Sequence, residues 1–329
     1  MVTSVDYIGG FAVSKYIIDN LRAQFVSIGR RIALCSVDKL SELAVEIRAR
    51  KDSGEVSPAV YEKYLKDISY TAPASISGAS SVLLVATPIG RSVLELELEG
   101  GAFLATIPPT YGAEDLITDC ESRLASVLGS SGIAYERAWL PLKALAARMG
   151  LARYGRDNVL RFEGLGSFVR LDAWWTELEA KGEAWEEPRV LERCSSCRAC
   201  IKACPNGCIS EDTFVIDASR CLTYLNEGKG LFPEWLDASA HNAAVGCLLC
   251  QDACPENRKV PGQEVYRRIV LNREESESLL MGRPIAEISA TSAAAVRAAE
   301  MVGSEANLAR NLRSLIAAQE SSDRPRIQA

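Results

Sequence analysis

The sequence has almost no histidine, because His241 is the only one in 329 residues. This scarcity argues against chemistry that needs several imidazoles, such as a histidine-rich metal site or a cysteine–histidine nucleophile pair. His241 itself falls between Cys221 and Cys247, where we expect an ordinary residue of a surface loop and not a ligand or a base.

Long apolar runs are also missing. The first 25 residues mix Asp6, Lys15, Asp19 and Arg22 among apolar residues, so they lack the uninterrupted apolar stretch of a signal peptide. No later run reaches the roughly 18 apolar residues of a membrane span. The net charge is −6 and there is no long block of Lys or Arg, so a large nucleic-acid footprint is not expected. We therefore expect a cytoplasmic protein with no membrane partner.

Cysteine, by contrast, is plentiful and unevenly placed. Nine of the 11 cysteines lie in the 61 residues from Cys194 to Cys254, and only Cys35 and Cys120 lie outside this segment. In a reducing compartment such crowding favours metal ligation over disulfides. The two outlying cysteines sit in apolar patterns, and we expect both in the core.

The crowded cysteines form two related motifs. The first has three cysteines separated by two residues each and a fourth that is followed by proline: Cys194, Cys197, Cys200 and Cys204. The second has a distant leading cysteine and then the same ending: Cys221, Cys247, Cys250 and Cys254. A loop with this spacing wraps one face of a four-iron cube, while the cysteine before proline ligates the other cluster. The spacing therefore predicts two [4Fe–4S] clusters.

Crossed ligation assigns the eight cysteines to two sets. One cluster takes Cys194, Cys197, Cys200 and Cys254, and the other takes Cys221, Cys247, Cys250 and Cys204. The alternative is a pair of structural zinc sites, in which cysteines two residues apart are common. Zinc requires neither the third evenly spaced cysteine nor the two Cys-Pro endings, so we favour iron–sulfur clusters. Cys208 could replace Cys221 as a ligand, but we expect it to be a small buried residue beside a cluster.

Ahead of the cysteines, strands and helices are mixed without regular alternation. Residues 82–86 are continuously apolar, which predicts a central strand buried on both faces. Residues 92–99 alternate between Leu and Glu from residue 94 on, as in a half-exposed strand. Residues 159–175, interrupted by two glycines, predict a hairpin that includes Trp174 and Trp175 as packing residues. This pattern favours an α+β fold.

Composition divides the chain into three predicted parts. Residues 1–185 form an α+β domain, residues 186–262 a bacterial 2[4Fe–4S] ferredoxin-like domain, and residues 263–329 a short C-terminal helical appendage. In the last part we expect helices over 264–281, 291–301 and 304–318, and a frayed tail from residue 320.

Several segments resemble one family of reductases. The stretch Cys194–Pro205, the phrase Arg220-Cys-Leu-Thr-Tyr-Leu225 and the run Gly246-Cys-Leu-Leu-Cys-Gln-Asp-Ala-Cys-Pro255 are similar to the cluster domain of epoxyqueuosine reductases and their relatives, the reductive dehalogenases. The segment Gly150–Arg156 resembles that family's Gly-Leu-Gly-x-x-Gly-Lys segment. The resemblance covers roughly residues 20–260 and is specific only from about residue 136 onward.

The resemblance implies a nitroreductase-like α/β sandwich that binds cobalamin and receives electrons from two clusters. An external donor of the ferredoxin or flavodoxin type would reduce the clusters. Counting back from Gly150 places Glu136 at the family's acidic proton donor, and Tyr111 is a second candidate for the active pocket. The residues implied to contact the cofactor are Arg153, Tyr154, Gly155 and Arg156.

Plain structural roles remain open for each of these candidates. Glu136 could pair with Arg137 at the surface, Tyr111 could belong to a rigid turn after two prolines, and the segment 153–156 could cap a helix. The chain also departs from the family. The serine and proline that flank its acidic residue are absent, and so is the Asp-Tyr-His signature of the tRNA-modifying members.

Together these observations favour an iron–sulfur oxidoreductase that passes electrons through two clusters to cobalamin and then to a substrate, either a small molecule or a corrinoid protein. One alternative is an electron-transfer protein that reductively activates a corrinoid held by a partner. Another is a tRNA-modifying epoxyqueuosine reductase. Because the signature is missing and the chain is acidic, we do not expect tRNA to be a partner.

Overall fold

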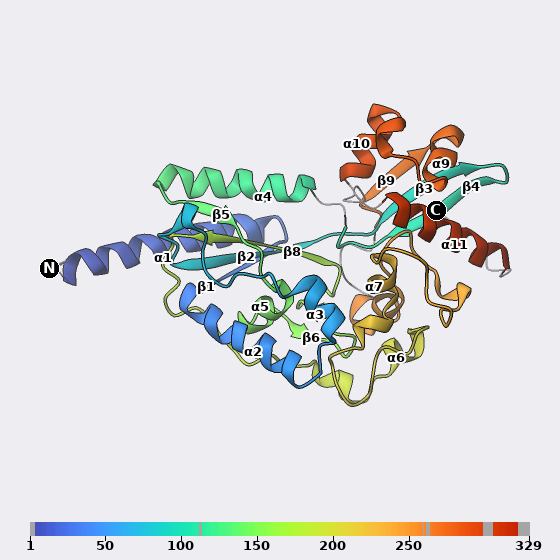
Figure 1. The fold of residues 1–329 in the computed structure, drawn as a ribbon. Coiled ribbons are helices and arrows are strands. Elements are labelled where there is room, and N and C mark those ends of the chain that lie inside the picture. Colours follow the sequence, from blue (N-terminus) through green and yellow to red (C-terminus); the bar gives the residue numbers. More distant parts are fainter. Residues whose placement is uncertain (1–3, 112–113, 259, 261–263, 299–304, 322–329) are drawn as a thin grey trace. The chain divides into compact units, whose positions relative to one another are not determined.

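The computed structural model describes residues 4–111, 114–258, 260, 264–298 and 305–321, which form two compact units (Figure 1). Unit 1 comprises Met1–Pro88, Leu116–Glu163 and Val169–Ser195. Unit 2 comprises Ile89–Asp115, Gly164–Phe168 and Ser196–Ala329. No helix of the described residues combines the length and the hydropathy that a bilayer span requires.

Unit 1 is an antiparallel sheet of four strands with helices on both faces. Its strands, in spatial order, are β1 (Arg31–Ser36), β2 (Ser81–Pro88), β8 (Val169–Thr176) and β5 (Tyr135–Arg137). Its helices are α1 (Ser4–Ser27), α2 (Leu40–Asp52), α3 (Pro58–Tyr64), α4 (Glu114–Val127) and α5 (Leu142–Arg148). A small ribbon of β6 (Arg153–Tyr154) and β7 (Leu160–Arg161) completes the unit.

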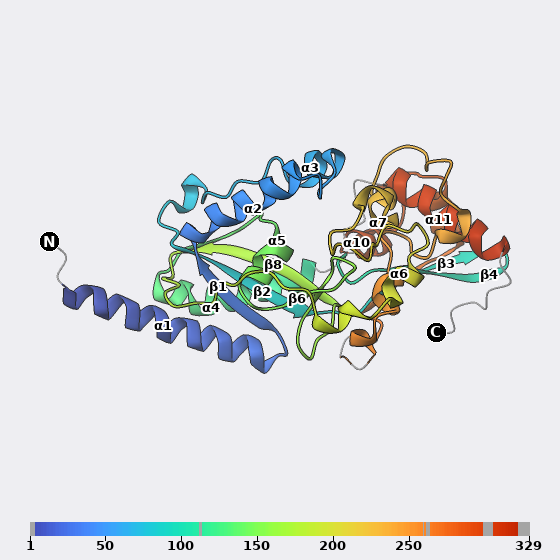
Figure 2. The same cartoon turned by 90° about the horizontal axis from the view of Figure 1, so that it is seen from below.

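Strand β2 is the buried centre of this sheet, as its apolar run predicted, and all its residues from Ser81 to Thr87 are buried. Helices α1 and α4 cover one face of the sheet, and α2 and α5 cover the other (Figures 1 and 2). Cys35 and Cys120 are buried here, as predicted, and burial raises the pKa of their thiols to about 12 and about 11. Since the thiolate is the reactive and ligating form, both residues act as core side chains.

The predicted hairpin over residues 159–175 is wrong. Strand β8 pairs with β2 and β5, whereas β7 pairs with β6. Gly164 and Gly166, with φ of 72° and 68°, turn the chain between the two strands. A Cβ at Gly166 would lie only 2.5 Å from Asn257 Oδ1, so this turn requires glycine. The two tryptophans of β8 are buried, as predicted.

Unit 2 combines a second sheet with the cysteine-rich segment. The sheet contains β4 (Gly101–Ile107), β3 (Ser92–Leu98) and β9 (Arg267–Leu271), with β9 parallel to β3. Leu94 and Leu96 of β3 are buried and Glu97 is exposed, which confirms the predicted alternation. Helices α9 (Arg273–Leu280), α10 (Ala290–Ala298) and α11 (Glu305–Ser321) complete the apolar core of this sheet. The cysteine segment contains the short helices α6 (Ala199–Ala203), α7 (Leu222–Asn226) and α8 (Leu249–Asp252).

The single helix predicted over residues 264–281 is wrong, because its first half is strand β9. Ile269 and Leu271 alternate with more exposed residues and are buried, which is the pattern of a strand. Asn272 then begins α9 through a capping box, in which its side chain accepts from the Glu275 N–H and the Glu275 carboxylate accepts from the Asn272 N–H. The predicted end of the next helix at 299–301 and the tail from residue 322 lie outside the described residues.

The two units differ from the predicted domain boundaries, although the α+β class is confirmed. Residues 89–115 group with unit 2 because β3 and β4 form a sheet with β9. For the same reason the C-terminal helices cover a sheet and are not an isolated appendage. The paired residues of strands β3 and β9 are separated by more than 170 residues of chain. A pairing over this distance leaves no signal in the local sequence pattern from which it could be predicted.

Candidate iron–sulfur and substrate sites

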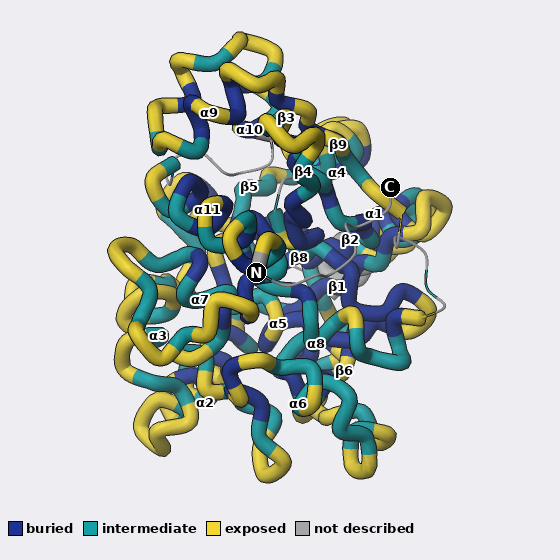
Figure 3. The backbone as a smooth tube through the Cα atoms, turned by 90° about the vertical axis from the view of Figure 1, so that its right-hand side faces the viewer, coloured by how far each residue is buried: buried dark blue, intermediate teal, exposed yellow. Residues whose placement is uncertain are grey.

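The cysteines of the chain fall into two environments. All 11 are free cysteines, and the eight predicted ligands are partly exposed, whereas Cys35, Cys120 and Cys208 are buried. Figure 3 shows the backbone coloured by how far each residue is buried. Partial exposure fits sulfurs that face an inorganic core and not apolar side chains. The prediction that Cys208 is buried is confirmed.

One helix from each cysteine motif lies beside the other in unit 2. Helix α6 carries Cys200 and helix α8 carries Cys250, and these helices contact each other. Each helix is followed by a Cys-Pro pair, at Cys204 and at Cys254. Crossed ligation requires that the end of each motif approach the other motif. The contact between the helices therefore suits two interleaved clusters.

The described residues contain no group of three or more His, Cys, Asp or Glu that converges closely enough to hold a single metal ion. A zinc ion gathers its four ligands around one point. A [4Fe–4S] cube takes one cysteine at each iron, so its four ligands surround the cube instead. Eight cysteine sulfurs match the donor set of two such cubes. The assignment of each cysteine to a cube stays a prediction.

Asn242 contacts Cys247, a predicted ligand of the second cluster. Its Nδ2 donates to Cys247 Sγ at 3.3 Å and to the carbonyl of Ala240 at 2.9 Å. Its Oδ1 accepts from the N–H of Leu248 at 3.4 Å, which fixes the amide orientation. Hydrogen bonds to cluster sulfurs tune the reduction potential. No sequence pattern pointed to this asparagine, because its only signal is proximity to a cysteine.

Tyr111 packs against the loop that immediately precedes Cys247 in unit 2. Its hydroxyl donates a hydrogen bond to the carboxylate of Glu227. A Cβ at Gly246, where φ is 65°, would lie 3.0 Å from the Tyr111 ring and 3.0 Å from Pro108. Tyr111 therefore supports the residue that immediately precedes Cys247. Whether it also supplies a proton stays a prediction.

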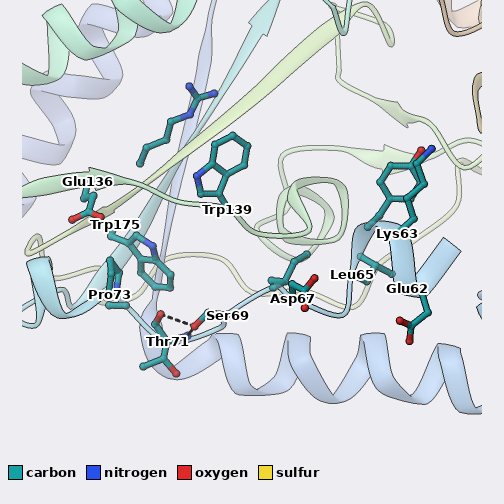
Figure 4. A pocket seen from close by; sticks show the side chains of 14 residues that line it. Glu62, Lys63, Leu65, Asp67, Ser69, Thr71, Pro73, Glu136, Trp139 and Trp175 are labelled. Atoms are coloured by element: carbon teal, nitrogen blue, oxygen red, sulfur yellow. Dashed lines mark hydrogen bonds between the residues drawn. The ribbon is translucent and has the colours of Figure 1, made fainter. Parts of the chain in front are cut away.

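Glu136 lines a pocket of about 520 Å³ in unit 1 (Figure 4). Ser75 Oγ donates to Glu136 Oε2 at 2.5 Å. Arg137 forms its ion pair with Asp172, at 2.9 Å, and its guanidinium stacks over Trp139 with 5.2 Å to the ring centroid. Glu136 thus accepts a hydrogen bond from a neutral hydroxyl, and its side chain lines a space that can hold a ligand.

The pocket combines aromatic walls with a few polar groups. In the view of Figure 4, Glu136 and Trp175 lie toward one end, Trp139 lies near the middle, and Glu62 and Lys63 lie toward the other end. Trp139 is 75% exposed, which is unusual for so large an apolar side chain. Aromatic surface with a small set of oriented polar groups is typical of sites for small organic ligands.

The segment predicted to contact a cofactor makes contacts within unit 1. Arg156 donates from Nη2 and Nε to the carbonyl of Cys194, at 2.6 and 3.1 Å. Tyr154 is buried, which raises the pKa of its hydroxyl, and a Cβ at Gly155 would lie 2.6 Å from Asp157 Oδ1. Neither these residues nor the exposed Arg153 line the pocket of Glu136. Arg156 instead holds the backbone of the first predicted cluster ligand.

The expectation that His241 lies in a surface loop is wrong, because the residue is only 6% exposed. Its ring packs on Phe232 with 4.6 Å between centroids. Burial, and then the charge of Arg310, lower the pKa of the imidazole. The contact with Phe232 fits a packing role for this side chain. The apolar neighbours that bury it come from a loop whose path cannot be deduced from local sequence.

The comparison with known protein families supports the predicted iron–sulfur cluster domain. Residues 193–257 match the family described as a 4Fe–4S double cluster binding domain. The epoxyqueuosine reductase of Cellulophaga algicola is 35% identical over 117 residues, which are 35% of this chain and 37% of that protein. That of Cyclobacterium marinum is 32% identical over 133 residues, which are 40% of each chain. The match thus spans well under half the length of these relatives.

Solved structures extend the likeness to nearly the whole chain. The epoxyqueuosine reductase of Bacillus subtilis superposes with a TM-score of 0.67 at 19% identity, covering 94% of this chain and 83% of that one. The chain has the epoxyqueuosine reductase fold. The predicted resemblance and fold class are therefore confirmed. Another structure with the epoxyqueuosine reductase fold, with a TM-score of 0.64 and 19% identity over 94% of this chain and 83% of that one, contains an epoxyqueuosine-modified tRNA stem loop. The tRNA stem loop is a property of that neighbour.

Proposed function

We propose that this protein is an iron–sulfur reductase of the epoxyqueuosine reductase type, and that its substrate is a modified nucleoside in tRNA. Two [4Fe–4S] clusters would carry electrons from an external donor of the ferredoxin or flavodoxin type. The names of the relatives and the tRNA stem loop in one similar structure support this choice over a free small molecule. The sequence favours a small molecule or a corrinoid protein as the substrate. The proposal instead takes the alternative of a tRNA-modifying epoxyqueuosine reductase.

The single observation that carries the proposal is the pocket around Glu136 in a chain with a double cluster domain. A reduction consumes protons as well as electrons, so the site needs a group that can donate a proton to the product. Glu136 is a carboxyl at a ligand-sized cavity and is oriented by Ser75, and the exposed ring of Trp139 lines the same cavity. An exposed indole offers a flat surface on which a nucleobase or another ring can stack. The proposed roles are therefore proton donor for Glu136 and stacking platform for Trp139.

The finer part of the proposal is a cobalamin cofactor. When bound, cobalamin would supply a strongly reducing cobalt centre that accepts electrons from the clusters and reduces the substrate. Unit 1 contains no histidine, so a corrinoid held there would have no imidazole ligand from that unit. The residues of unit 1 would bind the ring, exclude water and hold a proton at Glu136.

A second candidate is an electron-transfer protein that reduces a corrinoid held by a partner protein. It is favoured by the segment 153–156, whose described contacts lie within unit 1 and which does not line the pocket. In that case unit 1 would not bind cobalamin itself. Absorbance titration with cobalamin separates the two candidates, since only the first requires stoichiometric binding with an altered cobalt spectrum.

The decisive experiment is an anaerobic assay on tRNA that carries epoxyqueuosine, with a chemical reductant and with or without cobalamin. Digestion of the tRNA and mass analysis of its nucleosides measures conversion to queuosine. The proposal requires conversion by the wild type and none by a variant that lacks the clusters. Intact clusters together with no conversion, in the presence of cobalamin, would contradict the proposed substrate.

A further inference from the structure

Cys208 lies between two sulfurs that the crossed ligation assigns to the same cluster. Its Sγ is 3.3 Å from Cys204 Sγ, and its side chain also hydrogen-bonds with that of Cys221. The residue itself is 5% exposed. Cysteine that merely fills space packs its sulfur against apolar atoms. Here the sulfur instead faces two predicted ligands of the second cluster.

The fold holds Cys208 in this place through both neighbouring segments. Gly207, with φ of 61°, turns the chain just before it. The carbonyl of Cys208 accepts from the N–H of Asp217, at 2.9 Å, and Asp217 precedes the turn that leads into Cys221.

A second pair of contacts joins the same two segments. Asn206 Nδ2 donates to the carbonyl of Arg220 at 2.9 Å, and Arg220 Nε donates to the carbonyl of Asn206 at 3.1 Å. Asn206 and Cys208 are therefore tied to the residues immediately before Cys221. The backbone thus holds the Cys208 sulfur beside that of Cys204 and next to the segment that leads to Cys221.

We propose that Cys208 is a reserve ligand of the second cluster, which can bind the iron that Cys204 otherwise holds. In the exchange, the iron–sulfur bond of Cys204 breaks and an iron–sulfur bond to Cys208 forms. The proton of the Cys208 thiol passes to the sulfur of Cys204. The cluster keeps four thiolate ligands, no electron is transferred, and no other reactant is required. The inference rests on the double cluster domain and is independent of the substrate.

The test compares three variants with the wild type after anaerobic purification, by counting iron and inorganic sulfide per chain. The variants are Cys204→Ala, Cys208→Ala and the double variant. Two four-iron clusters give about eight irons in the wild type. We expect about eight irons in each single variant and about four in the double variant. The first cluster serves as an internal standard, because its retention shows that the chain has folded.

Two results would overturn the proposal. If Cys204→Ala already holds only about four irons, Cys208 does not substitute for the lost ligand. If Cys208→Ala alone drops to about four irons, Cys208 is a permanent ligand and not a reserve. Should Cys204→Ala fail to fold, Cys204→Ser gives the same comparison by electron paramagnetic resonance. Its reduced second cluster should keep an all-sulfur spectrum that changes when Cys208→Ala is added, and an identical spectrum in both would refute the inference.

A wild type without iron or sulfide would contradict the cluster assignment itself. If the wild type holds about eight irons but Cys204→Ala holds only about four, the result contradicts only the reserve role of Cys208. The iron count therefore separates failure of this inference from failure of the proposed function.

Discussion

Asn242 Nδ2 donates a hydrogen bond to Cys247 Sγ across 3.3 Å. A donor at a ligand sulfur stabilises the more negative, reduced cluster relative to the oxidised one. A difference of about 1 kcal/mol between the two states corresponds to about 40 mV for a one-electron couple. We therefore expect Asn242→Leu to lower the potential of the second cluster by tens of millivolts, measured by redox titration with electron paramagnetic resonance.

The first cluster is the matched control in the same molecule, and its potential should not move in Asn242→Leu. Equal shifts of both clusters would indicate a general loosening of the domain. No shift in either cluster would show that the hydrogen bond is absent from the loaded protein.

Gly246 and Gly230 provide a matched pair for the contact between Tyr111 and the second cluster loop. Both have positive φ, at 65° and 88°, but only Gly246 has neighbours within 4 Å of an added Cβ. Backbone strain costs about 1 kcal/mol at either site, and crowding against Tyr111 and Pro108 adds about 1–3 kcal/mol at Gly246. Gly246→Ala should therefore lower the thermal unfolding midpoint more than Gly230→Ala and should perturb the second cluster. Equal effects of the two substitutions would mean that Tyr111 does not restrain this loop.

The sequence predicts local features of this protein well. The run 82–86 encodes a strand buried on both faces, and the Leu/Glu alternation of β3 encodes one buried face. The cysteine spacing leads directly to the domain that the family comparison supports. Each of these signals can be recognised from the local order of residues in the sequence.

Long-range relationships could not be predicted in the same way. The local pattern of residues 264–281 favours a helix, whereas β9 forms because it pairs with β3, which lies far away in the chain. The burial of His241 against Phe232 depends on the path of a loop, and the hydrogen bond from Asn242 depends on side-chain placement. The pocket at Glu136 is lined by segments that are far apart in the sequence, so no local pattern predicts it.

Glu136 is expected to donate a proton in the proposed reduction. Glu136→Gln keeps the size of the side chain and removes the acid, so the rate should fall by about 10²–10⁴-fold with iron content unchanged. Glu62 lines the same pocket and pairs with Lys66 at 2.8 Å, so Glu62→Gln is the matched control. If Glu136→Gln and Glu62→Gln lower the rate equally, Glu136 contributes only its negative charge to the pocket and does not transfer the proton.

Cys200 is assigned to the first cluster. Cys200→Ser should leave about four irons per chain and retain the second cluster, as measured by metal analysis and by the remaining paramagnetic signal. Cys120→Ser is the control, since Cys120 is buried in unit 1 among apolar residues and should not affect iron content. An unchanged iron count in Cys200→Ser would contradict the crossed assignment.

The most direct measurement is quantification of iron, inorganic sulfide and zinc per chain in protein that has been purified anaerobically. The account predicts about eight irons, about eight sulfides and almost no zinc. Stoichiometric zinc without inorganic sulfide would contradict it, because eight cysteines that bind zinc cannot transfer electrons, and the proposed reduction would be lost as well.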